Sequence, residues 1–235
     1  MAVKKINSTF EDKDIEFLDI RERTDLTNFF ETLQKNVNLK YWDTSRVTNM
    51  KKMFTKSVVD ITGLENWNTS RVTDMSFMFY NCVTFNCDIS RWDTTNVQNM
   101  RSMFHFAESF NQPIGRWNVI NVKDMRNMFS GATSFNQPIG SWNVINVTDM
   151  RSMFEDAESF NQPIGSWNVI NVKNMSNMFF GATKFNQPLL YWDTSNVKSM
   201  HRMFLSAKSF NQSISSWIIR EDTNKDHMFE DTDTY

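Results

Sequence analysis

The fold of this chain is decided by one stretch, Phe135-Asn-Gln-Pro-Ile-Gly-Ser-Trp-Asn-Val-Ile-Asn-Val-Thr-Asp-Met-Arg-Ser-Met-Phe154, because its pattern recurs every 25 residues along the sequence. All 8 tryptophans lie on this lattice, and so does every methionine except Met1. A fixed period of this length is typical of proteins in which each repeat is one structural unit stacked on the next. We therefore predict a repeat solenoid of about eight coils.

Columns of apolar side chains run through the repeats and predict one continuous core. The tryptophan column contains Trp42, Trp67, Trp92, Trp117, Trp142, Trp167, Trp192 and Trp217. Further columns start at Val47, Met50, Met53, Phe54, Leu64 and Phe85. A single coil buries too little of this apolar surface to offset the entropy of ordering its residues, so neighbouring coils must cover its faces.

One half of each coil has the spacing of a short amphipathic helix. In residues 121–132, Asn121 followed by Asp124 resembles a capping box, and Gly131 suits a helix end. The apolar side chains of this segment are Val122, Met125, Met128, Phe129 and Ala132. We predict one short helix per coil.

The other half of each coil, residues 135–143, has apolar residues at irregular spacing and contains Pro138. We predict a brief strand near Ile139 and a turn after Trp142. Each coil is then a short strand plus a short helix, and the fold class is an α/β repeat solenoid.

The two ends of the chain look like caps. Residues 1–40 are predicted to form an N-terminal cap, residues 41–217 the solenoid, and residues 218–235 a C-terminal capping coil with a polar tail. Phe17, Phe29 and Leu39 keep the apolar lattice in the first cap, and Met228 and Phe229 keep it in the last coil. Helical spacing of Leu26, Phe29, Phe30 and Leu33 predicts a helix near residues 25–35.

The repeated columns of Trp, Val, Met, Met-Phe, Ala and Phe-Asn, from about residue 42 to 217, resemble the repeat of BspA-like leucine-rich-repeat surface proteins. This resemblance implies a right-handed, leucine-rich-repeat-like stack and a role in adhesion or protein recognition. Members of that family occur on bacterial surfaces, and similar repeats occur in large DNA viruses.

Composition limits the classes of partner. The net charge of −2 gives no bulk attraction to nucleic acid or to anionic membranes, and no apolar run is long enough for a membrane span. The first residues do not have the pattern of a signal peptide, so we expect a soluble protein of the cytoplasm or a virion rather than a secreted one. Surface display is expected only if this sequence is a mature fragment.

No catalytic, cofactor or metal site is predicted. His105, His201 and His227 are the only histidines and share no column, and no nucleotide-binding or hydrolase motif occurs. Cys82 occupies a column of alanines, where a buried thiol is favoured over a nucleophile. The recurring carboxylates Asp74, Asp124 and Asp149 are interpreted as helix caps. The asparagine column, Asn86, Asn111, Asn136, Asn161, Asn186 and Asn211, is interpreted as an amide ladder that satisfies backbone groups.

Two sets of residues are candidate binding surfaces. The first is a basic stripe, interrupted by serines, consisting of Lys51, Arg101, Arg126, Arg151 and His201. It suits an acidic partner, although Asp124 and Asp149 offset its charge, and a solvated face is the alternative.

The second candidate is an apolar strip confined to the central coils, at positions where outer coils carry Thr-Ser. It consists of Val119, Ile120, Val144, Ile145, Val169 and Ile170. An exposed strip of this kind marks an interface, and the alternatives are core packing or a recent duplication.

The sequence therefore predicts a non-catalytic protein-binding or structural module whose partner is a protein, including a second copy of the chain through the central strip. The alternative is an exported, adhesin-like surface protein.

Overall fold

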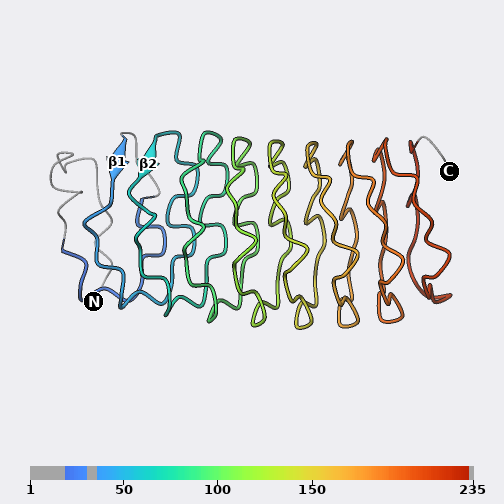
Figure 1. Ribbon diagram of the computed structural model, residues 1–235, viewed down its shortest axis with the longest axis horizontal. Coiled ribbons are helices and arrows are strands. Elements are labelled where there is room, and N and C mark those ends of the chain that lie inside the picture. The colour runs from blue at the N-terminus through green and yellow to red at the C-terminus, as the bar shows by residue number, and fades with distance from the viewer. Residues whose placement is uncertain (1–18, 31–35, 233–235) are drawn as a thin grey trace.

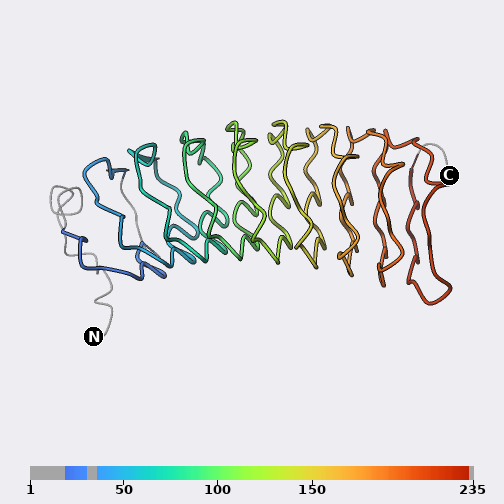
Figure 2. The same cartoon turned by 60° about the horizontal axis from the view of Figure 1, so that its bottom comes forward.

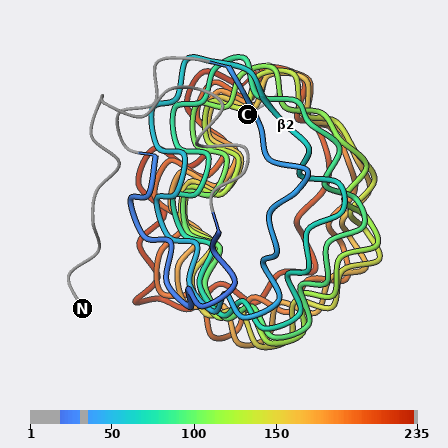
Figure 3. The ribbon, with the colours of Figure 1, turned by 90° about the vertical axis from the view of Figure 1, so that its left-hand side faces the viewer.

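The computed structural model describes residues 19–30 and 36–232. The described chain is a regular stack of coils that advances along one long axis (Figure 1). Turning the stack shows that the loops of successive coils continue to lie side by side (Figure 2). An end-on view shows the coils overlaid around one common outline, with a small progressive offset (Figure 3). The predicted repeat stack with a 25-residue period is confirmed.

The prediction of a strand and a helix in every coil is wrong. The described residues contain no α-helix, and their two strands are β1 (Val37–Asn38) and β2 (Ile61–Thr62). These strands pair in parallel, with Val37 opposite Ile61 and Asn38 opposite Thr62. Residues 25–30 form a bridge and turns rather than a helix, and Ile139 lies outside any strand. Phe17, Leu33 and the rest of the expected 31–35 helical segment lie outside the described residues.

Hydrogen bonds to the next coil replace the expected helix. The N–H groups of Met125, Asn127 and Phe129 donate to the carbonyls of Asp149, Arg151 and Met153, which lie 24 residues ahead. The N–H groups between them close turns within the coil, as Met128 does to Met125. In an α-helix each of these N–H groups would instead bond four residues back.

Backbone dihedral angles also show that these segments are turns and not helices. Asn127 has φ of 56° and Gly131 has φ of 68°, and equivalent residues in other coils also have positive φ. A helix needs φ near −60° at every residue, whereas β-turns of type II place a positive φ at their third residue. Overlapping turns return an apolar side chain to the core at intervals of one, three and four residues, which is why the sequence resembled a helix.

A ladder of single parallel bridges runs beside these turns and ties each coil to the next. It links Asp25, Asn49, Asp74, Asn99, Asp124, Asp149, Asn174, Ser199 and Asn224. Residues near Asp25 therefore belong to the first coil of the same ladder. Among the described residues, no helix is long and apolar enough to cross a bilayer.

The core is a set of stacked aromatic columns. The rings of Trp142 and Trp167 lie 6.4 Å apart and within 2° of parallel, and those of Phe129 and Phe154 lie 5.7 Å apart. Phe135 stacks on Phe129 at 4.0 Å within one coil. Each of these side chains is at most 3% exposed, so the predicted apolar columns do form one core.

Buried polar groups are paired in the same register. The indole Nε1–H of Trp142 donates to the carbonyl of Ile114 in the preceding coil at 3.2 Å, and the bond recurs from Trp67 to Trp217. The asparagine ladder is confirmed: Oδ1 of Asn111 accepts the N–H of Asn136 and an amide N–H of Gln137, both at 3.0 Å. Side-chain ladders thus reinforce the backbone ladder.

The indole hydrogen bond provides the first test. Trp142→Phe keeps an aromatic ring but leaves the buried Ile114 carbonyl without its donor, so we expect the free energy of unfolding to fall by about 1–3 kcal/mol. The urea midpoint, followed by intrinsic fluorescence, measures this change. An unchanged midpoint would show that the indole donor contributes nothing to stacking.

Candidate functional site

One long face of the stack, which we name the turn face, combines four positions from each of the eight coils that follow the coil of Asp25. It consists of positions 51, 52, 55 and 56 and their equivalents at intervals of 25, ending at 226, 227, 230 and 231. Between these positions lie the buried Met and Phe columns, such as Met53 and Phe54, both 0% exposed. The turns that send these apolar side chains inward leave most of the intervening residues at least partly exposed, and those that are buried are serines and glycines.

The turn face is where the coils differ from one another. Over the eight coils that begin at Trp42, its four columns contain between five and seven residue types each, whereas only one other column, that of Val58, contains five and the rest contain at most four. The column through Thr55, for example, continues with Tyr80, His105, Ser130, Glu155, Phe180, Leu205 and Glu230. The frame of the repeat is thus nearly constant, and its variation is concentrated on one surface.

Aromatic side chains gather in the first half of this face. We name Phe77, Tyr80, His105 and Phe106 the aromatic patch. The rings of Phe77 and Tyr80 lie 6.0 Å apart, Tyr80 lies 5.1 Å from His105, and His105 lies 4.3 Å from Phe106. Phe106 is 41% exposed, and burial among these rings lowers the pKa of His105. A partner that packed here would cover apolar surface across two coils.

Cations flank the aromatic patch. The ammonium of Lys52 lies 5.7 Å from the centre of the Phe77 ring, and the guanidinium of Arg101 lies 5.4 Å from the same ring. Nε of Arg101 is buried and has no hydrogen-bond partner. A depression of about 310 Å³ next to this cluster is lined by Asn28, Lys52, Thr55, Lys56, Phe77 and Tyr80. The geometry suits contact with carboxylate and apolar groups together.

Glycine at two turn-face positions makes room for larger neighbours. A Cβ on Gly131, whose φ is 68°, would lie 2.2 Å from the ring of Phe106. A Cβ on Gly181 would lie 2.1 Å from Oδ1 of Asp156. Phe106 and Asp156 therefore lie over the backbone of the following coil.

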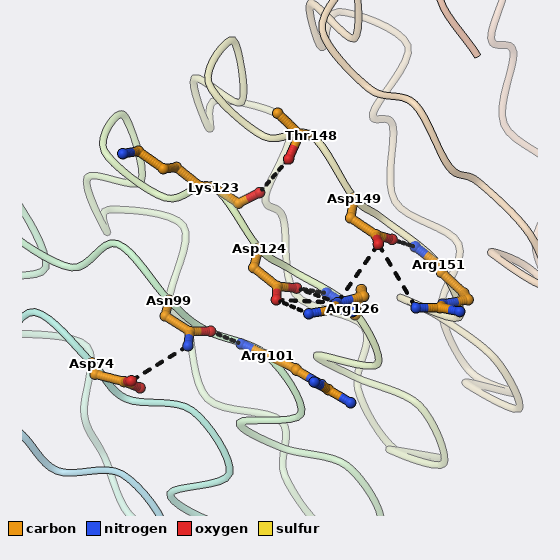
Figure 4. A network of polar contacts seen from close by, with 9 residues as sticks. All are labelled: Asp74, Asn99, Arg101, Lys123, Asp124, Arg126, Thr148, Asp149 and Arg151. Atoms are coloured by element: carbon orange, nitrogen blue, oxygen red, sulfur yellow. Dashed lines mark hydrogen bonds and ion pairs between the residues drawn. The ribbon is translucent and has the colours of Figure 1, made fainter. Parts of the chain in front are cut away.

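The predicted basic stripe is one column of the turn face, and half of its charge is neutralised. Arg126 forms an ion pair with Asp124 at 2.5 Å and lies 3.6 Å from Asp149, which is also 3.8 Å from Arg151 (Figure 4). The hydrogen bond to Asp124 raises the pKa of Arg126. Lys51 and Arg101 have no ion-pair partner among the described residues, and Nδ1 of His201 is buried without a hydrogen bond.

The helix-cap interpretation of the recurring aspartates is wrong, because there is no helix to cap. Oδ1 of Asp124 accepts the N–H of Arg126, and Oδ1 of Asp149 accepts that of Arg151, both at 3.0 Å. Asp74 does the same for Ser76 at 2.7 Å. These side chains stabilise turns by the contact that an Asx-turn uses, two residues along the chain.

The central apolar strip is narrower than predicted. Val119, Val144 and Val169 are each 1% exposed and belong to the core, whereas Ile120, Ile145 and Ile170 are half-buried. In outer coils a buried threonine takes the valine position and donates to the next coil, as Thr94 Oγ1 does to the Asn118 carbonyl at 2.9 Å. The valines cannot contact a partner, because they fill an internal position that accepts either valine or threonine.

Both cysteines are free, and Cys82 is buried as predicted. Its Sγ lies 2.9 Å from the Phe54 carbonyl, and burial raises the pKa of this thiol to about 12. Burial also raises the pKa of Cys87, which is only partly covered. No group of three or more His, Cys, Asp or Glu side chains that could hold a metal ion occurs in the part of the chain that the structure describes.

Sequence reasoning missed Phe77, Tyr80 and Phe106 as surface residues. None of these three residues belongs to a repeated apolar column, and each lies in a column whose residue type changes from coil to coil. That variation between coils was the available signal.

Two threonine substitutions test the placement of the central valines. Val144→Thr should change the free energy of unfolding by less than about 0.5 kcal/mol, because the new hydroxyl can donate to the Asn168 carbonyl as other coils do. Val147→Thr is the matched control and should cost about 1–3 kcal/mol, because no coil places a hydroxyl in that column. Equal losses in urea denaturation would contradict this assignment.

Thiol reactivity tests the burial of Cys82. At pH 8 the thiolate of Cys82 is scarce and covered, so iodoacetamide should modify Cys87 first and Cys82 only in unfolded chains. Mass spectrometry of digested protein measures both sites. Cys82→Ala, which restores the column's usual residue, should leave both stability and Cys87 labelling unchanged; faster labelling of Cys82 than of Cys87 would contradict the structure.

Comparison with known proteins gives a family but no characterised relative. No curated protein and no solved structure matches the chain. The family model described as "Mycoplasma protein of unknown function, DUF285" matches residues 2–61, 56–160 and 138–235, which together span nearly the whole sequence. The chain therefore belongs to the DUF285 family.

Proposed function

We propose that this chain is a non-catalytic protein-binding module that recognises its partner through the turn face. The observation that carries this proposal is the concentration of sequence variation in the four turn-face columns. Ladder and core columns repeat because every coil needs them to stack. Residues that change from coil to coil at the surface are free to serve recognition.

The chemistry of the turn face supports protein recognition in particular. Aromatic and arginine side chains dominate the energetics of protein interfaces, because aromatic rings cover large areas and the planar guanidinium of arginine donates several hydrogen bonds. Phe77, Tyr80 and Phe106 lie next to Arg101 on one continuous surface. The histidines pack against other rings, as His105 does with Tyr80 and Phe106, which favours contact over catalysis.

Adhesion is the more specific form of this proposal. The resemblance of the Trp, Met-Phe and Phe-Asn columns to those of BspA-like leucine-rich-repeat surface proteins favours it, and it requires the protein to reach the outside of a cell or particle. Surface biotinylation of the source cells distinguishes an exported adhesin from a module that works inside, since only the former is labelled in intact cells.

Site-specific photo-crosslinking tests the proposed binding face. A photoreactive phenylalanine analogue placed at Phe77 or Phe106 should capture the same protein from extracts of the source cells, and the same analogue at Tyr191 should not. Tyr191 is the matched control, because it is 88% exposed and lies outside the turn face.

The affinity of variants for the captured protein then tests whether the turn face binds it. Phe77→Ala and Phe106→Ala should each weaken binding at least about tenfold, which corresponds to about 1.4 kcal/mol, whereas Tyr191→Ala should not. Equal capture from Tyr191, or affinity that is unchanged by both turn-face variants, would reject the proposal.

A further inference from the structure

Charge is segregated along the turn face. The first of its eight coils carries Lys51, Lys52 and Lys56, and the last carries Asp226, Glu230 and Asp231. The net charge of the whole chain is only −2, but the two ends of the turn face carry opposite charges.

Most of these end charges have no partner within the chain. Glu230 pairs with His227 at 2.6 Å, but none of the three lysines, nor Asp226 or Asp231, forms an ion pair with another described residue. Asp231 accepts only a hydroxyl hydrogen bond, from Ser206 at 3.2 Å. Both ends of the turn face are therefore available to opposite charge from outside.

We propose that the turn faces of two copies of the chain pack against each other in antiparallel orientation. The two-fold axis lies in the plane of the interface, perpendicular to the stack, between the coil of Arg126 and the coil of Arg151. This inference rests on the proposed function, because it names a second copy as one partner of the turn face.

The repeat fixes the register of this pairing. Because both copies share the 25-residue lattice, alignment of one pair of coils aligns all of them, and each column meets its own column. At the ends, Lys51 then faces Asp226 and Lys56 faces Asp231. These pairs form twice, once at each end of the dimer.

The interior of the interface is also complementary. Phe77 of one copy faces Arg202 of the other, which is a cation–π pair, and Tyr80 faces Leu205. One coil further in, His105 faces Phe180.

Charges at the centre are compatible with close approach. Arg126 and Arg151 face each other across the axis, but Asp124 and Asp149 already neutralise them. In the parallel arrangement, by contrast, the three lysines of one copy would face those of the other. Charge therefore selects the antiparallel dimer.

The turn face is large enough for such a dimer. Four positions in each of eight coils give 32 positions per copy, of which 25 are not buried. A stable interface uses about 20–30 residues from each partner. The acidic end also disfavours a long polyanion such as nucleic acid, which would have to follow the whole face.

The experiment is a charge-exchange series followed by light scattering of the full chain. The native protein should have twice the 27.8 kDa chain mass at low salt, and the dimer should weaken as salt screens its ends. Lys51→Glu with Lys56→Glu, and separately Asp226→Lys with Asp231→Lys, should each give monomers, because like charges then face each other. An equimolar mixture of the two variants should dimerise again, because both ends of the mixed pair are complementary.

Arg91→Glu with Arg116→Glu is the control, since it reverses two exposed cations outside the turn face and should leave the dimer intact. Tryptophan fluorescence shows that each variant has kept its stacked core. A monomeric native chain, a dimer that survives charge reversal, or folded variants that fail to pair when mixed would each overturn the proposal. Failure here would leave the capture of another protein from Phe77 and Phe106 as a separate result, so failure of the dimer and failure of the proposed function are distinguishable.

Discussion

Alternate N–H groups of each turn donate to carbonyl groups 24 residues ahead, and the stack depends on this ladder. Each coil has neither a helix nor a sheet of its own, and the N–H groups that do not close a turn within the coil are paired only when a neighbour is present. Because burial of an unpaired backbone group costs free energy, each coil is stable in its folded conformation only when the next coil is present. The indole donors and the asparagine ladder extend the same dependence to side chains.

The ladder also explains the unusual backbone. Residues such as Asn127, Phe106 and Asp156 have φ between 54° and 56°, which costs a non-glycine residue on the order of 1–2 kcal/mol. The strain is tolerated because the turn places two N–H groups toward the next coil and returns Met and Phe side chains to a close-packed core. The fold thus constrains dihedral angles at the turn face more tightly than it constrains residue type.

That freedom in residue type gives the turn face its character. With Met and Phe buried beneath them, neighbouring surface positions accept lysine, phenylalanine, glutamate or glycine without loss of the ladder. Three lysines lie in the first of the eight coils, the aromatic patch spans the second and third, and three carboxylates lie in the last. The chemistry of the turn face therefore changes with position along the stack. Because the spacing between coils is constant, its basic end can lie opposite the acidic end of a second, antiparallel copy.

The sequence by itself determined the period, the apolar columns, the buried Cys82 and the asparagine ladder, because each follows from a residue type that recurs at a fixed interval. It did not determine the backbone of the coil: Met125, Met128 and Phe129 have helical spacing, and overlapping turns produce the same spacing. Only the tertiary structure decided between them, because the hydrogen-bond partner of Asn127 lies 24 residues ahead in another coil and no local pattern records it. The same holds for the surface. Val144 and Ile145 are adjacent apolar residues in the sequence, and it is the packing of the next coil that buries the first and leaves the second half-exposed.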